Sequence, residues 1–196
     1  MKERTQDTKE MLDLRTFPES SRPHRVGRRL LAGLVVAVAT TFLAHAALAG
    51  PPPPAVPDDL QPGDGKPFLV GHGIGVQIYA CDGVAWTFVA PRADLFADNG
   101  QLIISHFGGP SWQAGDGSTV VGTVLKKVTP DQTAVPWLLL SAAPAPGSKP
   151  GRLDQTTFIQ RVNTTGGLTP PASDCNAATA STRVEVPYSA DYYFWK

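Results

Sequence analysis

Apolar and polar residues alternate along much of the chain after residue 75, in short runs separated by turn residues. Alternation with a period of two is typical of strands that bury one face, because successive side chains point to opposite faces of a sheet. No amphipathic helix of ten residues or more is indicated in this region, although 91–98 favours a single helical turn. The runs that predict strands are 75–81, 84–90, 101–107, 118–128, 135–143, 155–163, 183–186 and 190–195.

Turn signals join these predicted strands. Asp82-Gly83 predicts a two-residue hairpin, since a type I′ turn requires positive φ at both central positions. The run 135–143, VPWLLLSAA, is apolar at successive positions and predicts a central strand buried on both faces. About eight strands at short intervals, without a fixed-period repeat, predict an all-β fold: a single antiparallel sandwich or barrel.

The first 49 residues follow a different pattern. Four arginines between residues 22 and 29 precede an uncharged apolar run at 30–49, which ends Ala47-Leu48-Ala49 before Gly50. This small-x-small ending predicts that residues 1–49 are a cleaved signal peptide and that the protein is periplasmic or extracellular. An inner-membrane anchor at 30–49 is the alternative, since about 18 apolar residues can span a bilayer. The pair Arg28-Arg29 leaves general secretion and twin-arginine export both open.

Residues 50–67 are rich in proline and predict a linker, so the all-β domain is expected at 68–196. After cleavage the chain would carry 12 acidic and 9 basic side chains, a net charge of −3. Its densest basic pair is Lys126-Lys127, whereas nucleic-acid binding needs a clustered basic face. We therefore expect no nucleic-acid partner and, once the leader is cleaved, no stable membrane insertion.

The chain contains two cysteines, Cys81 and Cys175, and both follow the predicted signal peptide. An even cysteine count in an oxidising compartment is typical of a structural disulfide. We therefore predict a bond between Cys81 and Cys175 that ties the first strand of the domain to a long Gly/Pro/Thr-rich loop.

Several motifs in the expected order resemble a family of exported bacterial and fungal proteins that is known only as a domain of unknown function. The resemblance spans about residues 68–196 and implies export and an all-β domain. It implies no reaction, substrate or cofactor. The motifs are GVQIYAC, HFGGPSW, DGS at 116–118, VPWLLL, IQRVNTTGG and YSADYYFW.

A catalytic site is one reading of the stretch 102–124. His106 with Asp116 and either Ser118 or Ser111 has the residue types of a base, an orienting acid and a nucleophile. The competing interpretation is that His106, which shares a face with apolar neighbours, is a hydrogen-bonded and half-buried histidine. No G-x-S-x-G motif supports a serine nucleophile. A cell-envelope hydrolase or redox enzyme that uses His106 and Asp116 therefore stays an alternative.

Other chemistry has less support in the sequence. Only His72 and His106 are histidines after residue 50, which is too few for a zinc or copper site without scattered aspartates. The triplets 98–100 and 116–118 are typical of turns and lack EF-hand spacing. Glu185 is the only glutamate after residue 50, which argues against a glycosidase carboxylate pair. No nucleotide-binding glycine loop opens a helix. We expect no metal and no cofactor.

Aromatic residues indicate binding instead. Trp112 lies among glycine and proline, where we expect it to be solvent-accessible and to share a pocket rim with His106, stacking on a sugar or an apolar ligand. Arg161 alternates with apolar neighbours and is either paired inside the sheet or directed at a ligand. The sequence therefore favours an exported, non-catalytic module that binds a glycan, a small apolar molecule or an envelope partner; a structural surface protein is a further alternative.

Overall fold

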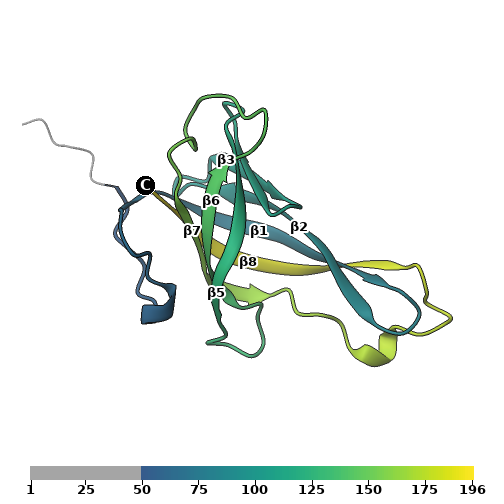
Figure 1. Ribbon diagram of the computed structural model, residues 1–196. Helices are drawn as coiled ribbons and strands as arrows, with labels where there is room; N and C mark the ends of the chain where they lie inside the picture. Colours follow the sequence, from purple (N-terminus) through teal and green to yellow (C-terminus); the bar gives the residue numbers. More distant parts are fainter. Residues whose placement is uncertain (1–49) are drawn as a thin grey trace, which may run out of the picture. The chain divides into compact units, whose positions relative to one another are not determined.

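Eight antiparallel strands close into one barrel in the computed structural model, which describes residues 50–196 (Figure 1). The strands are β1 (Pro67–Cys81), β2 (Trp86–Phe96), β3 (Leu102–Phe107), β4 (Ser111–Ala114), β5 (Thr119–Val128), β6 (Trp137–Pro144), β7 (Phe158–Gly166) and β8 (Arg183–Trp195). Each pairs with the next along the chain, and β8 pairs with β1 to close the ring. The all-β class and the barrel alternative are confirmed. The expected signal peptide at 1–49 lies outside the described residues.

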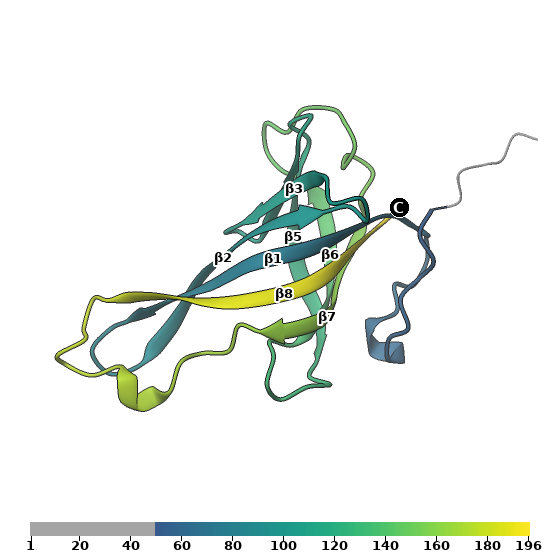
Figure 2. The same ribbon diagram turned by 180° about the vertical axis from the view of Figure 1, so that it is seen from behind.

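Strands β1 and β8 are 15 and 13 residues long. Together with β2, they extend beyond the ends of the neighbouring strands β3 and β7. Pairing of β2 with β3 starts at Ala93, and pairing of β8 with β7 ends at Tyr188. Residues 76–92 and 183–187 therefore form a three-stranded extension, called the arm below. Figures 1 and 2 show the arm projecting to one side of the barrel, with the short turn η2 (Ala172–Asp174) near its end.

Two predicted elements differ in the structure. The helical turn at 91–98 is wrong: β2 continues to its end there, because Ala93 and Leu95 alternate into the barrel core. The last two predicted strands are one strand, β8, which passes through Pro187. The Pro187 carbonyl accepts from the Gly167 N–H, and the nitrogen of a strand residue points to the same side as its carbonyl. The Pro187 nitrogen therefore faces the edge where pairing with β7 has ended, and a proline is tolerated there.

The turn between β1 and β2 is also longer than predicted. Four residues, 82–85, separate the strands, and only Gly83 among them has positive φ. The carboxylate of Asp82 accepts hydrogen bonds from the N–H groups of Val84 and Ala85, both at 2.8 Å. A side-chain cap on the turn thus replaces the tighter two-residue geometry.

Strand β4 lies between the predicted strands 101–107 and 118–128, where the sequence predicts no strand. It pairs with both β3 and β5, so Trp112 points into the barrel. The indole has room because β5 carries Gly122, where a Cβ would lie 2.9 Å from the Trp112 ring. In the same way, a Cβ at Gly73 would lie 2.8 Å from the ring of Tyr192. Glycines on neighbouring strands therefore leave space for large aromatic rings in the interior of the barrel.

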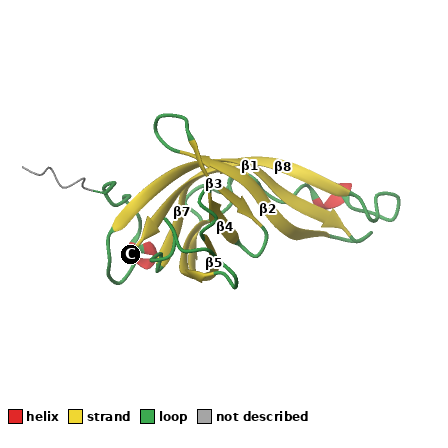
Figure 3. Ribbon diagram, turned by 90° about the horizontal axis from the view of Figure 1, so that it is seen from above, coloured by secondary structure: helices red, strands yellow, loops and turns green. Residues whose placement is uncertain are grey.

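The proline-rich segment before β1 touches the barrel. Its short turn η1 (Asp58–Leu60) places Leu60 in a fully buried position. Gln160 donates to the Leu60 carbonyl at 2.7 Å and accepts from the Trp195 indole at 2.8 Å. Figure 3 shows that the only helical segments of the described chain are the short turns η1 and η2. Within residues 50–196, no helix has the length and apolar character needed to cross a membrane.

Candidate functional site

A cavity of about 440 Å³ lies at the end of the barrel where the arm begins, and residues of both line it. Its volume falls within the range of roughly 300–1,000 Å³ that is common for small-molecule sites. An eight-stranded barrel is wide enough to be filled by side chains or to hold one small ligand. The walls are mainly apolar or aromatic, and they include Tyr79, Phe88, Val89, Pro91, Leu138 and Leu140.

His106 and Trp112 form one aromatic wall of this cavity. They face each other across the β3–β4 ladder, and their rings stack with centroids 4.4 Å apart and planes inclined by 8°. Nδ1 of His106 bonds to the Ser111 carbonyl at 2.8 Å, which assigns the proton to Nδ1 and leaves Nε2 as an acceptor. Burial lowers the pKa of His106 to about 4, so the ring is neutral near pH 7.

The prediction that Trp112 is solvent-accessible is wrong. Its side chain is 1% exposed and lines the cavity from inside the barrel. The physical reason is β4, which turns the indole inward against the space left by Gly122. The expected proximity to His106 is present, but as a buried stack and not as an exposed rim.

Arg161 brings a full positive charge into the cavity. It faces Tyr192 across the β7–β8 ladder and is partly buried. Its Nε and Nη2 atoms donate to the Pro136 carbonyl at 3.2 and 2.8 Å. Among residues 50–196, no carboxylate lies within salt-bridge distance of this guanidinium. The sequence left two roles open for Arg161, pairing inside the sheet or pointing at a ligand. The hydrogen-bond partner that it has is the neutral Pro136 carbonyl, not a carboxylate.

Two tyrosines stand beside this cation. The hydroxyls of Tyr188 and Tyr192 are 3.0 Å apart, and both side chains are buried. Burial raises the pKa of each phenol, so both stay protonated and neutral under physiological conditions. Of the two tyrosines, Tyr192 lines the cavity, which therefore offers a neutral hydroxyl and one guanidinium.

Two further donors are buried without a partner among the described residues. These are Nε2 of Gln77 and Nε1 of Trp112, and both residues line the cavity. An unpaired buried donor costs about 1–3 kcal/mol, and such groups are rare in native proteins. Sequence reasoning missed Gln77, although its polar side chain stands at an inward position of an otherwise apolar strand face.

The residues of the alternative catalytic set are not assembled. Asp116 is exposed in the β4–β5 turn, where it accepts from the Ser118 hydroxyl, the Ser118 N–H and the Arg152 N–H. These bonds lower the pKa of Asp116 to about 2. His106 bonds instead to the backbone of Ser111, so neither serine nor Asp116 forms a dyad with it.

A second histidine lies on the outer surface. His72 is bonded through Nδ1 to Asp191 at 2.7 Å and through Nε2 to Asp98 at 2.8 Å. These two hydrogen bonds raise the pKa of His72. The group joins β1, β8 and the loop after β2, a connection that the sequence alone did not indicate. Residues 50–196 contain no cluster of three or more His, Cys, Asp or Glu arranged to hold a metal ion.

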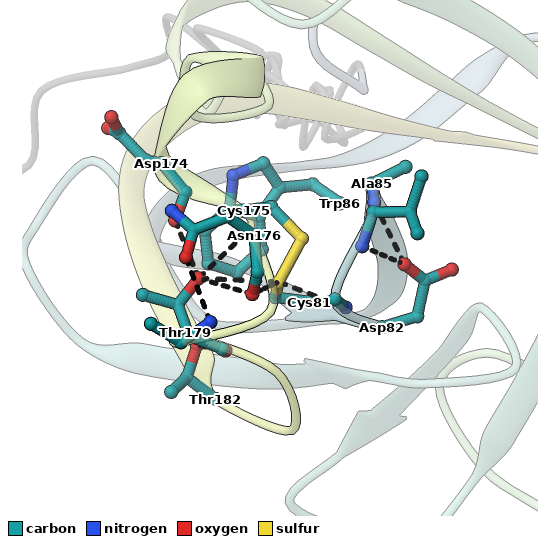
Figure 4. Close-up of a disulfide and its surroundings, with 12 residues drawn as sticks. Cys81, Asp82, Ala85, Trp86, Asp174, Cys175, Asn176, Thr179 and Thr182 are labelled. Atoms are coloured by element: carbon teal, nitrogen blue, oxygen red, sulfur yellow. Dashed lines mark hydrogen bonds between the residues drawn. A yellow bond between two sulfur atoms is a disulfide. The ribbon is translucent and has the colours of Figure 1, made fainter.

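The predicted disulfide is confirmed. Cys81 and Cys175 are bonded, with their Cα atoms 5.4 Å apart and a sequence separation of 94. Figure 4 shows the bond beside the Asp82 turn, with the side chain of Thr179 in contact with the neighbouring loop backbone. The disulfide therefore fixes the loop 167–182 to the end of the arm.

Comparison with known proteins gives one match. Residues 62–196 match a family model described as "Protein of unknown function (DUF3455)". The chain matches no curated protein and no solved structure. The match covers all eight strands of the barrel and assigns no activity to them.

Proposed function

The chain belongs to the DUF3455 family of proteins of unknown function, and on this premise we propose that it is an exported barrel that binds a small, largely apolar molecule. The observation that carries the proposal is the cavity of about 440 Å³ where the barrel meets the arm, with walls of aromatic and aliphatic side chains. A non-catalytic binding role fits the separation of His106 from Asp116.

The mouth of the cavity supports entry of an apolar ligand. Phe88 and Val89 line it and are about half exposed, which places apolar surface at the boundary between the cavity and solvent. Val89 also occupies an irregular position in the β1–β2 ladder, where pairing shifts between Ile78 and Tyr79. A β-bulge of this kind redirects a side chain locally and is often found near binding sites.

The buried position of Trp112 favours a small apolar ligand over a glycan. A carbohydrate platform needs an aromatic face open to solvent, whereas this indole is covered by His106 and by the barrel interior. Stacking on a surface sugar is therefore not the role that the geometry supports.

Export is supported by the disulfide and by the leader pattern. Structural disulfides persist in oxidising compartments and are rare in the cytosol. The bond between Cys81 and Cys175 stands in the part of the chain that follows the predicted cleavage site. A protein of the periplasm or the outer surface would meet small apolar molecules before they reach the cell interior.

The test is a fluorescence titration of the purified protein, expressed from the full chain, with N-phenyl-1-naphthylamine. This uncharged probe becomes brighter in apolar surroundings. Val89→Trp should weaken binding because the larger ring narrows the cavity mouth. Val84→Trp is the matched control, since Val84 is in the same hairpin, is 82% exposed and does not line the cavity. Absence of saturable binding by the wild-type protein, or equal loss in both variants, would reject the proposal.

A further inference from the structure

The cation in the cavity has no anion to balance it among residues 50–196. Placing a charge in a partly apolar environment is costly unless a counter-charge or a complete set of hydrogen bonds compensates it. Among the described residues, Arg161 donates to the Pro136 carbonyl, and its other neighbour of this kind is the neutral Tyr192 hydroxyl, so no anion compensates the charge. None of the described residues that line the cavity is acidic.

The carbonyl of Pro136 holds the guanidinium in one orientation and leaves donors free. A guanidinium has five N–H groups, and the bonds from Nε and Nη2 use two of them. The remaining three are on Nη1 and Nη2, which form the end of the planar fork. Two parallel N–H groups on such a fork match the two oxygens of a carboxylate.

The groups beside Arg161 are neutral, so they do not repel an anion. Tyr188 and Tyr192 are neutral phenols whose hydroxyls bond to each other, which leaves one hydroxyl proton to donate. The ring of His106 is neutral, so its contribution to the cavity is apolar surface and one acceptor nitrogen. The charged end of a ligand would therefore meet one cation and nearby neutral donors, while its other end lies among apolar side chains.

We propose that the ligand is an amphipathic carboxylate whose apolar body occupies the cavity and whose carboxylate pairs with Arg161. This inference rests on the proposed binding function and specifies the chemical class of its ligand. It also gives a reason for an arginine at an inward position of β7 that no internal carboxylate among the described residues balances.

The experiment is displacement of bound N-phenyl-1-naphthylamine by decanoate and by decan-1-ol, two ten-carbon competitors that differ in the head group. The purified protein, expressed from the full chain, is used at neutral pH. Decanoate should displace the probe from wild-type protein at about tenfold lower concentration than decan-1-ol, because a charge-assisted pair is stronger than a neutral hydrogen bond.

Variants locate that preference. Arg161→Gln should abolish it while the uncharged probe still binds, and Arg161→Lys should reduce it because the planar fork is lost. Arg152→Gln is the matched control, since it removes the same charge from an exposed residue outside the cavity. If Arg161→Gln does not fold, Arg161→Lys decides the question, and an unchanged preference in that variant overturns the inference.

The failures are separable. Binding of the probe with equal displacement by decanoate and decan-1-ol would overturn the carboxylate inference and leave the apolar cavity function standing. A preference for decanoate that persists in Arg161→Gln would overturn the role of Arg161. Failure of wild-type protein to bind the probe at all would reject the proposed function itself.

Discussion

The imidazole of His106 lies flat on the indole of Trp112, with their ring centroids 4.4 Å apart. The two rings are only 8° from parallel. Tyr192 packs beside them, with its ring centroid 5.3 Å from that of His106. His106 is 3% exposed and bonds to a backbone carbonyl, so it is a neutral wall of the cavity. Its titration is therefore linked to folding.

We predict that His106 makes the protein less stable as pH falls. Its pKa is about 4 in the folded protein and 6.5 without burial, so the unfolded chain takes up the proton first between these values. The stability contribution of His106 is present above pH 6.5 and is lost toward pH 4, by roughly 3 kcal/mol in full. Urea unfolding from pH 4 to 8 should show a flatter profile for His106→Phe than for the wild-type protein. Parallel profiles for the two proteins would contradict the prediction.

His72 should show the opposite dependence. Hydrogen bonds that His72 donates to Asp98 and Asp191 raise its pKa, so its stabilising contribution is complete below pH 6.5 and is lost as pH rises through the raised value. In an NMR titration, the pKa of His72 should lie above 6.5, and Asp98→Asn should lower it. Asp94→Asn is the control, because Asp94 bonds to Ser105 and not to His72. A His72 pKa below 6.5 in the wild-type protein would be inconsistent with hydrogen bonds from His72 to the carboxylates of Asp98 and Asp191.

The space opposite Trp112 gives a packing prediction. A Cβ at Gly122 would lie 2.9 Å from the indole and 3.0 Å from Leu140, so Gly122→Ala should destabilise the barrel by about 1–3 kcal/mol through overpacking. Gly115→Ala is the control, because a Cβ there meets nothing within 4 Å and the backbone does not require glycine. Equal urea midpoints for the two variants would show that the interior can adjust.

The strand pattern could be predicted from the sequence, but the orientation of Trp112 could not. Alternation located most strands because each barrel strand buries one face, which is a local signal. Strand β4 has only four residues and follows a Gly-Gly-Pro turn, so it is too short for a period of two to stand out. The indole points inward because Gly122, on another strand, leaves room for it. That is a long-range relationship which local alternation does not contain.

For the cavity residues too, the sequence predicts local features but not long-range contacts. Alternation placed Arg161 on the same face as Ile159, and the structure puts both inside the barrel. Whether Arg161 had a partner depended on Pro136, which is 25 residues away in sequence. The pairing of His106 with Asp116 was the alternative that residue types alone suggested. It fails because local hydrogen bonds in the β4–β5 turn engage the carboxylate first.

Cleavage of the leader stays a prediction from the sequence. The small-x-small ending before Gly50 should make Gly50 the N-terminal residue of the exported protein. Terminal sequencing of protein recovered from the periplasm or medium checks this directly. Ala49→Arg should block processing, whereas Ala55→Arg, beyond the expected site, should not. Exported protein that still begins before Gly50 would favour the membrane-anchor alternative.

Removal of the disulfide should cost more stability than any single substitution above. The bond joins residues 94 positions apart, and chain-entropy reasoning assigns about 4.7 kcal/mol to a 100-residue loop. Removing a native disulfide typically costs about 2–5 kcal/mol, so we expect Cys81→Ala/Cys175→Ala to fall in that range. Without the bond, the loop 167–182 is held to the arm by hydrogen bonds such as Trp86 Nε1 to the Pro171 carbonyl at 3.2 Å.

The arm should therefore loosen before the barrel does. Limited proteolysis of the double variant should cut first within 167–182, while the strands that surround His106 stay protected, because they are tied by the closed ladder and not by the disulfide. Trp86→Phe with both cysteines intact is the control for the lost indole bond. It should leave the loop resistant to cleavage. A double variant that unfolds at the wild-type urea midpoint, with its loop still resistant, would show that β1, β2 and β8 hold the arm without the disulfide.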